Sequence, residues 1–363
     1  MSNASAQRAR ELLATFIDPH TGLDLVCGGA LAGVAADGDR VAVDVVLPYP
    51  AATWTAELAL QLRQLLEADA LIAEAAVNVA WRVYAHRVQK ELTPLPKVRN
   101  IIAVASGKGG VGKSTTAANL ALALQAEGAR VGILDADIYG PSQPRMMGVT
   151  GKPESKDGKT IEPKIGHGVQ VMSIGFLIEE DTAMIWRGPM VSQALQQLLN
   201  DTQWVDLDYL VIDLPPGTGD IQLTLCQRVP VSGALIVTTP QDIALLDAKK
   251  GLKMFEKVEV PVLGIVENMA VHVCSACGHA EHIFGSGGGE LMASQYGVPL
   301  LGSLPLAMHV REQADSGTPT VIAAPDSLAA RVYREIARKT AARLSLQARN
   351  KKITMPSIVI SDN

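Results

Sequence analysis

Hydrophobic positions in the first 90 residues follow a helical period in some stretches and a strand period in others. Asp18-Pro19 closes the first helical stretch because the residue before a proline disfavours helix, and Asp37-Gly38 is a typical tight hairpin turn. The expected elements are a helix over 6–17, strands over 31–35 and 41–47, a helix over about 54–68, and a strand containing Val77, Val79, Trp81 and Val83. Together they predict a small α/β domain.

Beyond residue 97 the apolar runs become continuous and alternate with helical patterns. The runs cover residues 101–105, 131–134, 209–212, 234–237, 262–266 and 300–304. Strands buried on both faces lose their alternation, so these runs predict a doubly wound, mostly parallel sheet in an α/β fold. Two prolines in 91–97 indicate a linker, which divides the chain into a small α/β domain (1–90), a large domain (98–345) and a tail (346–363).

Composition excludes several classes of protein. The 363 residues are 48% hydrophobic but only 4% aromatic, and 32 basic side chains face 37 acidic ones for a net charge of -5. We therefore expect neither nucleic acid nor a membrane as partner, because the chain has no basic excess, no stacking platform and no apolar stretch long enough to span a bilayer. The first residues do not resemble a signal peptide, which leaves the cytoplasm as the expected compartment.

A phosphate-binding loop follows the first apolar run of the large domain. Its residues are Gly107, Lys108, Gly109, Gly110, Val111, Gly112, Lys113, Ser114 and Thr115, and they match G-x-x-x-x-G-K-[ST] at the start of an Ala/Leu-rich helix that continues to about residue 125. The glycines allow backbone N–H groups to curl around phosphates. Lys113 is expected to reach the β/γ-phosphates and Ser114 to bind Mg²⁺.

Lys108 is a second lysine within this loop, and with it the segment resembles the deviant phosphate-loop ATPases such as MinD, ParA and the nitrogenase iron protein. The motifs that narrow the resemblance are Leu134–Ser142, Trp186–Met190, Val211–Asp220 and Val266–Met269. Over residues 98–340 the chain is similar to the Mrp/ApbC branch, ATPases that carry iron–sulfur clusters. The resemblance implies a homodimer in which Lys108 reaches the nucleotide of the partner.

Three acidic residues follow or end apolar runs. Asp213 lies in an Asp-x-x-x-Gly pattern, which suits a carboxylate that senses Mg²⁺ and the γ-phosphate, although a strand-end cap is the alternative. The resemblance makes Asp137 the residue that orients the attacking water and Asp135 an outer group for Mg²⁺. Without the resemblance, the two aspartates could simply build a turn.

Two further positions depend on the resemblance. Asn268 corresponds to the residue that binds the adenine edge, and its amide has the donor and acceptor for that task, although an Asn after a strand is often a turn residue. Arg187 lies in a family motif without an assigned role.

Cys274 and Cys277 form a Cys-x-x-Cys pair flanked by His272, His279 and His282. Two thiolates give half of the ligands that a four-iron cluster needs, so two chains would complete the set, and the resemblance likewise implies a [4Fe-4S] cluster between protomers. Zinc bound with two of the histidines, a redox pair and an inert turn are the alternatives. The other two cysteines, Cys27 and Cys226, are expected to be small buried hydrophobes.

The small domain resembles, more weakly, the PaaD/SufT-like domains of iron–sulfur assembly proteins through residues 18–26 and the elements that follow. It lacks the cysteine that such domains often carry after the hairpin, since residues 47–54 contain none. We therefore expect it to dock proteins or to be structural.

Taken together, these features predict a homodimeric ATPase that uses ATP and Mg²⁺ and delivers a [4Fe-4S] cluster to recipient apoproteins. A nucleotide-switched positioning protein and a zinc-binding ATPase are the alternatives. A basic amphipathic helix predicted over about 327–345 favours the positioning protein, unless that helix packs on the sheet as the last helix of the domain.

Overall fold

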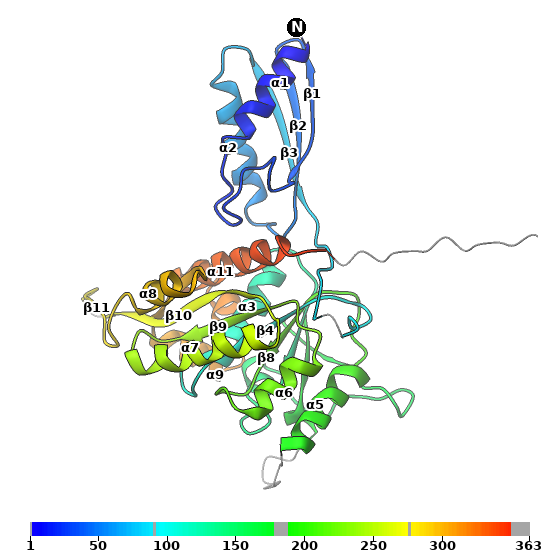
Figure 1. Cartoon of the computed structure of the whole chain (residues 1–363), viewed down its shortest axis with the longest axis vertical. Coiled ribbons are helices and arrows are strands. Elements are labelled where there is room, and N and C mark those ends of the chain that lie inside the picture. Colours follow the sequence, from blue (N-terminus) through cyan, green and yellow to red (C-terminus); the bar gives the residue numbers. More distant parts are fainter. Residues whose placement is uncertain (1, 90–91, 178–187, 275–276, 350–363) are drawn as a thin grey trace, which may run out of the picture.

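The computed structural model describes residues 2–89, 92–177, 188–274 and 277–349, and it contains two separate sheets (Figure 1). The smaller one orders its strands β1-β2-β3, with β1 antiparallel and β3 parallel to β2. Its elements are α1 (Ser2–Leu13), β1 (Leu31–Asp37), β2 (Arg40–Leu47), α2 (Thr55–Glu67) and β3 (Glu74–Trp81). Both helices pack on one face, where alternate residues of β2 are buried. The small N-terminal α/β domain is thereby confirmed.

Two details of this domain differ from the sequence predictions. Helix α1 ends at Leu13 instead of residue 17, because the following segment forms a turn in which the Asp18 carboxylate accepts hydrogen bonds from the backbone of His20 and the hydroxyl of Thr21, each at 2.9 Å. The hairpin loop is Gly38-Asp39, one residue later than expected. There Gly38 takes a φ of +63° at the first loop position.

The larger sheet has nine strands in the order β11-β10-β9-β4-β8-β5-β7-β6, with β12 also paired to β10. Its strands are β4 (Val98–Ala105), β5 (Val131–Asp135), β6 (Lys164–Gly166), β7 (Val169–Ser173), β8 (Leu207–Asp213), β9 (Gly233–Thr238), β10 (Val262–Val273), β11 (Ala280–Glu281) and β12 (Leu300–Leu306). Only β6 and β11 pair antiparallel, so the mostly parallel sheet is confirmed. The pattern missed β6, β7 and β11: β6 and β11 have only three and two residues, and in β7 the polar Gln170 interrupts the apolar run.

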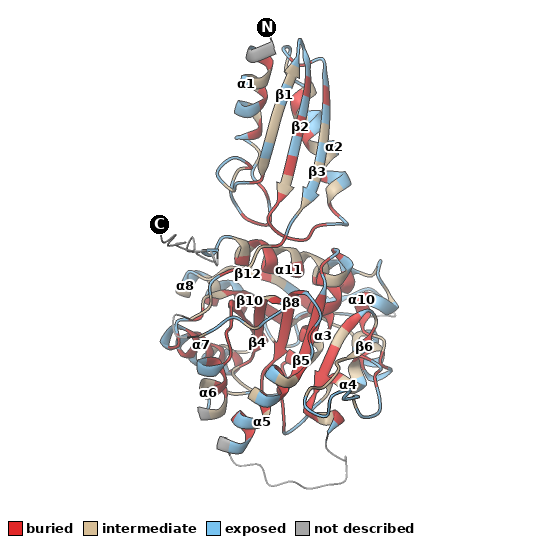
Figure 2. Cartoon of the chain, turned by 90° about the vertical axis from the view of Figure 1, so that its right-hand side faces the viewer, coloured by how far each residue is buried: buried red, intermediate tan, exposed pale blue. Residues whose placement is uncertain are grey.

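Helices cover both faces of this sheet. They are α3 (Lys113–Ala126), α4 (Gln143–Met146), the 3₁₀ turn η1 (Ile174–Phe176), α5 (Gly188–Asp201), α6 (Asp220–Arg228), α7 (Asp242–Lys257), α8 (Gly288–Tyr296), α9 (Met308–Asp315), α10 (Thr320–Ala323) and α11 (Leu328–Ser345). Helices α3 and α11 lie side by side beneath the N-terminal domain, and right-handed crossovers place α5 to α8 on the opposite face. Figure 2 shows that the central strands β4, β8 and β5 are buried almost throughout.

Helix α11 is the helix predicted over 327–345, and Ser327 caps it by accepting the N–H of Ala330 at 3.2 Å. On its apolar side Ile336 and Leu344 are fully buried, Val332 is half-buried, and Leu328 in the first turn is 57% exposed. Most of this side therefore packs as expected for the last helix of the domain. No helix within the described ranges is both long and apolar enough to cross a bilayer.

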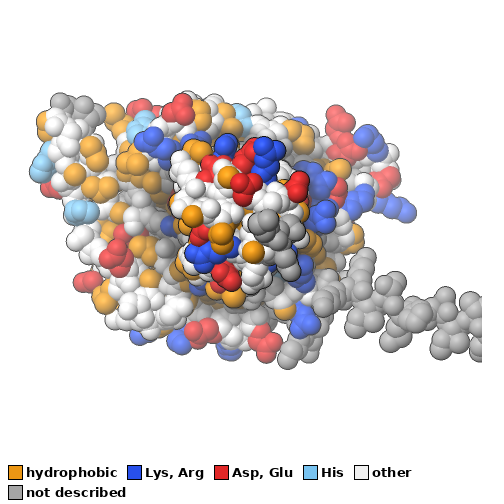
Figure 3. Space-filling model, turned by 90° about the horizontal axis from the view of Figure 1, so that it is seen from above, with side chains coloured by type: hydrophobic (Ala, Val, Ile, Leu, Met, Phe, Trp, Pro, Cys, Tyr) orange, Lys and Arg blue, Asp and Glu red, His pale blue; other side chains and the backbone are white. Residues whose placement is uncertain are grey.

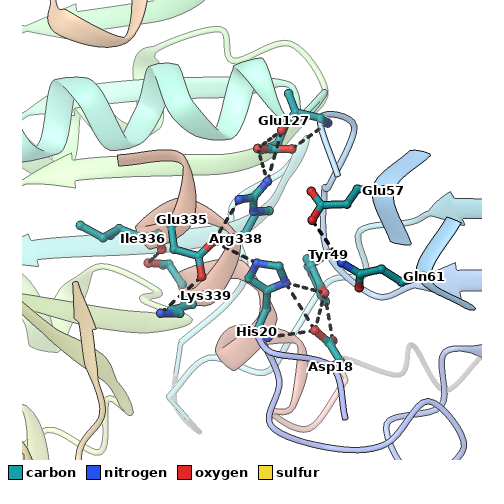
Figure 4. A network of polar contacts seen from close by, with 12 residues as sticks. Asp18, His20, Tyr49, Glu57, Gln61, Glu127, Glu335, Ile336, Arg338 and Lys339 are labelled. Atoms are coloured by element: carbon teal, nitrogen blue, oxygen red, sulfur yellow. Dashed lines mark hydrogen bonds and ion pairs between the residues drawn. The ribbon is translucent and has the colours of Figure 1, made fainter. Parts of the chain in front are cut away.

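An interdomain network of polar groups, most of them buried or half-buried, joins the two domains (Figure 4). Its members are Asp18, His20, Tyr49, Thr53, Glu127, Glu335 and Arg338. Glu127 caps the C-terminus of α3 and is fully buried, and its carboxylate accepts the hydroxyl of Thr53 at 2.6 Å and pairs with Arg338 at 3.3 Å. The N-terminal domain is therefore seated on the far end of the helix that begins at the phosphate loop.

The charges of this network satisfy one another. Burial opposes the charged form of His20, but hydrogen bonds to Asp18 and Glu335 outweigh it and raise the pKa of the imidazole. The hydrogen bond from His20 in turn lowers the pKa of Glu335, to which Arg338 also donates at 3.0 Å. The network therefore resembles a structural connection between the two domains more than it resembles a ligand-binding site.

Candidate nucleotide and cysteine sites

The phosphate loop connects the central strand β4 to α3, and its glycines have conformational reasons. Gly110 and Gly112 take φ values of +79° and +80°, which side-chain-bearing residues seldom adopt. At Gly107 a Cβ would lie 2.2 Å from the backbone of Asp247 in α7. The loop therefore requires glycine at these positions, and it leaves backbone N–H groups at the N-terminus of α3, where an anion is favoured.

Lys113 and the phosphate-site carboxylates, Asp135, Asp137 and Asp213, meet at one edge of the sheet. Strands β4, β8 and β5 are neighbours, so their carboxyl ends bring the loop, Asp213 and the other two aspartates together. The ammonium of Lys113 pairs with Asp213 and lies 3.8 Å from an Asp137 oxygen and 3.3 Å from the Ser114 hydroxyl. Residues predicted from three separate motifs thus share one site.

This cluster is short of positive charge. Burial, followed by the charge of Asp213, raises the pKa of Asp135 to about 7, and burial also raises the pKa of Asp137. Among the described side chains, Lys113 is the one cation paired with these carboxylates. The Ser114 hydroxyl and the carboxylates of Asp137 and Asp213 all lie around the Lys113 ammonium, and such oxygen donors fit Mg²⁺ once phosphate oxygens and waters complete its ligands.

Gln143 is a member of this site that the motifs did not reveal. It is fully buried at the start of α4, and its side-chain amide donates to Asp213 Oδ2 at 2.9 Å and to the backbone carbonyl of Ser114 at 3.0 Å. The only available signal was a glutamine directly before Pro144 in a segment following an acidic pair.

Lys108 and Asn268 occupy different surroundings. Lys108 is half-buried, and its ammonium makes no hydrogen bond or ion pair with any residue that the structure describes. The Asn268 amide lies against the loop and donates to the carbonyl of Val111 at 2.9 Å. Its side-chain carbonyl accepts the N–H of Met269, so both polar ends are engaged within the chain.

Cys274 and Cys277 lie at the tip of the hairpin formed by β10 and β11. The turn closes through backbone hydrogen bonds from Cys274 to His279 and from Gly278 to Cys274, both at 2.9 Å, and Gly278 takes a φ of +72°. Cys277 is exposed and Cys274 is half-buried. Hydrophobic residues next to the hairpin in the sequence are exposed, among them Val273 and Ile283. Hydrophobic side chains also lie beside the histidines at the left of Figure 3.

The neighbouring histidines do not complete a metal site within one chain. His272 and His282 each use Nδ1 on a backbone carbonyl, of Leu306 at 3.0 Å and of Ala270 at 2.7 Å. Within the described ranges, no three His, Cys, Asp or Glu side chains come together in a way that could hold a metal ion. The described part of a single chain therefore does not bring together the ligands that the zinc alternative requires.

Of the other two cysteines, only one follows the sequence prediction. Cys226 is buried, which raises the pKa of its thiol to about 12. Cys27 is exposed, so the prediction for it was wrong. The reason is that Cys27 lies in a turn, in which the Asp24 carboxylate accepts the Cys27 N–H at 2.8 Å, and there the side chain is exposed. Arg187 lies outside the described residues.

Comparison with known proteins finds a matching family for each of the two domains. Residues 97–341 match the family described as NUBPL iron-transfer P-loop NTPase, and residues 6–79 match a family described as iron-sulfur cluster assembly protein. The chain belongs to this family of iron–sulfur cluster carriers. It is a P-loop NTPase, and membership implies ATP hydrolysis.

Individual relatives agree with the family. The chain is 64% identical to the iron-sulfur cluster carrier protein of Pseudomonas fragi over 73% of this chain and 93% of the relative. It is 53% identical to the carrier protein of Escherichia coli strain K12 over 92% and 91%.

Solved structures support the fold of the large domain. A nucleotide-binding protein from Archaeoglobus fulgidus, in complex with ADP, aligns with a TM-score of 0.55 at 40% identity over 61% of this chain and 87% of that one. The cell division ATPase MinD of Pyrococcus furiosus aligns with a TM-score of 0.51 at 25% identity, over 66% and 97%.

Proposed function

We propose that two copies of this chain hold one [4Fe-4S] cluster between their Cys274 and Cys277 thiolates, and that binding and hydrolysis of ATP control its delivery to recipient apoproteins. Two thiolates per chain supply half of the four that such a cluster takes. The sparse, accessible thiols suit the reducing cytoplasm, where we place the protein. We divide the chain into functional units at 1–90, 91–97, 98–345 and 346–363.

The observation that carries this proposal is that one strand runs from the nucleotide site to the cysteines. Strand β10 contains Asn268, whose amide touches the phosphate loop, and ends one residue before Cys274. Six positions separate Asn268 from Cys274, and the strand is irregular between them, because Met269 takes a φ of +59° and the pairing with β12 shifts between Glu267 and Val271. A shift of the loop on nucleotide binding would therefore be passed to the thiols along this one strand.

Each residue of the site has a proposed task. Backbone N–H groups of the loop and Lys113 bind the phosphates, Asp137 orients the attacking water, and Asp213 senses the γ-phosphate. Ser114 would hold Mg²⁺, which supplies positive charge to the transferred phosphoryl group. Asn268 would have to exchange its contact with Val111 for the adenine edge.

Anaerobic reconstitution with iron and sulfide tests the cluster site. We expect about two irons and two sulfides per chain in the wild type, and loss of both in Cys274→Ser and Cys277→Ser. Cys27→Ser is the matched control, because it removes a thiol that is exposed like that of Cys277 but lies in the other domain. Four irons per chain, or a cluster retained by Cys277→Ser, would refute the shared site; zinc without sulfide would favour the zinc-binding ATPase.

The Lys108 ammonium has no partner among the residues that the structure describes, which supports a role across the dimer. If each active site takes Lys108 from one protomer and Asp137 from the other, mixed dimers of Lys108→Ala and Asp137→Ala chains contain one intact site. ATP hydrolysis should then partly return on mixing. Absence of recovery in demonstrated mixed dimers would show that Lys108 acts within its own chain or has no role in hydrolysis.

A further inference from the structure

Gln143 combines complete burial with a polar side chain in the middle of the charged site. Its backbone N–H donates to Asp135 Oδ2 at 3.0 Å, which fixes the start of α4 against β5. A buried amide is costly unless its polar atoms are hydrogen-bonded. The partners of this side chain therefore indicate what it is for.

The amide nitrogen joins three segments that are distant in sequence. Nε2 donates to Asp213 Oδ2 at 2.9 Å, at the end of β8, and to the Ser114 carbonyl at 3.0 Å, in the first turn of α3. The opposite orientation would press Oε1 against two acceptors, so these neighbours fix the amide. Gln143 thus ties the segment after Asp137 to the proposed metal-binding turn and to the sensing carboxylate.

The amide oxygen of Gln143 is not satisfied by the described part of the chain. Oε1 is buried and has no hydrogen-bond partner among the described residues, although it lies on the same amide that contacts the site. Buried acceptors are usually satisfied, and one that is not calls for an explanation. A ligand that brings hydrogen-bond donors into a site already rich in carboxylates, such as hydrated Mg²⁺ with a nucleotide, would satisfy it.

We propose that Gln143 is a positioning residue that holds Asp213 and the first turn of α3 in register, and that its Oε1 accepts a hydrogen bond when a magnesium-bound nucleotide enters. The inference rests on the proposed nucleotide site. It adds a residue that makes nucleotide binding depend on the metal.

The test measures the affinity of a fluorescent N-methylanthraniloyl ADP in excess Mg²⁺ and in EDTA. In Gln143→Met, which keeps the volume but has no amide, we expect the gain in affinity from Mg²⁺ to fall about tenfold while the affinity in EDTA changes little. In Gln143→Glu the sign reverses. A fourth carboxylate repels the bare polyphosphate and attracts the metal, so the gain from Mg²⁺ rises.

Gln89→Met is the matched control. The Gln89 amide also donates to a backbone carbonyl, that of Cys226 at 2.8 Å, and its Oε1 is also buried without a partner among the described residues, but it lies between β3 and β4. It should retain the wild-type dependence on Mg²⁺. A positioning role also predicts that Gln143→Met lowers kcat for ATP hydrolysis more than it changes KM.

A gain from Mg²⁺ within twofold of the wild type in both Gln143 variants would overturn the inference. If Gln143→Met does not fold, the sign predicted for Gln143→Glu still decides. Failure of the proposed function is distinguishable, because in that case the wild type itself would bind no nucleotide and Lys113→Ala would change nothing.

Discussion

The phosphate site and the interdomain network are both buried clusters of charge, and they differ in how the charges are balanced. At the phosphate site one lysine faces three carboxylates, and the pKa of Asp135 and that of Asp137 are raised. In the interdomain network cations and anions alternate, and the pKa values shift toward the charged forms, upward for His20 and downward for Glu335.

The difference distinguishes a site that can bind a ligand from a cluster that stabilises the fold. Groups whose ionised forms are disfavoured gain from an incoming cation, so the phosphate site is prepared for a metal-bound ligand. Groups that already satisfy each other gain nothing from a ligand, and their removal is felt as lost stability. Substitutions in the first cluster should therefore affect activity, and those in the second should affect stability.

The largest effect is expected for Lys113→Ala. Loss of this ammonium removes electrostatic stabilisation of the transferred phosphoryl group, so the rate of ATP hydrolysis should fall by a factor of about 10² to 10³. Release of phosphate under saturating ATP measures it. A rate equal to that of the wild type would contradict the assignment of the site.

Next in size is Glu127→Ala in the interdomain network. Removing the fully buried carboxylate takes the acceptor from Thr53 and leaves Arg338, whose side chain is only 15% exposed, with Glu335 as its remaining acidic partner, and it should lower the free energy of unfolding by about 3 kcal/mol. Urea unfolding checks this change. Glu162→Ala is the control, since it breaks the exposed pair with Lys156 and should cost less than about 1 kcal/mol. Equal losses of unfolding free energy in the two variants would mean that the network does not hold the domains together.

Gly128→Ala should be somewhat milder. Gly128 has a φ of +96°, and a Cβ there would lie 2.6 Å from the Trp81 ring of the N-terminal domain. Strain and overlap together should cost about 2 kcal/mol. Gly158→Ala separates the two causes, because φ is +68° there but nothing lies within 4 Å, and about 1 kcal/mol is expected. If both variants unfold at the same urea concentration, the contact with Trp81 contributes nothing.

The smallest effect is a pH dependence at His20, which faces Asp18, Glu335 and the hydroxyl of Tyr49. Its pKa is raised on folding, so the charged pairing stabilises fully below the unfolded pKa of about 6.5 and is lost as pH rises through the folded value. His20→Gln should therefore cost about 1 kcal/mol at pH 6 and less at pH 9. Thermal melts at both pH values measure this, with exposed His309→Gln as control. If His20→Gln destabilised the protein more at pH 9 than at pH 6, the raised pKa of His20 would be contradicted.

Local chemistry made much of the site predictable. A phosphate loop needs glycine where φ is positive and lysine where phosphate charge lies, so Gly110, Gly112 and Lys113 could be placed from spacing alone. Most of the buried strands were visible as apolar runs, and the Asp-x-x-x-Gly pattern was enough to expect Asp213 near the γ-phosphate. Strand β7 gave no such signal because Gln170 interrupts it, and the turn at Asp24 exposed a cysteine that its apolar neighbours suggested was buried.

The sequence by itself determined the fold class, the phosphate loop and the cysteine pair, because each depends on residues that are close together in the chain. Only the tertiary structure decided that Gln143 bridges Ser114 and Asp213, and that Glu127 at the end of α3 seats the N-terminal domain. These contacts join residues 29 to 74 positions apart. Hydrophobic periodicity carries no information about such pairings. They arise only when packing removes distant polar groups from water, so that the groups must hydrogen-bond to one another.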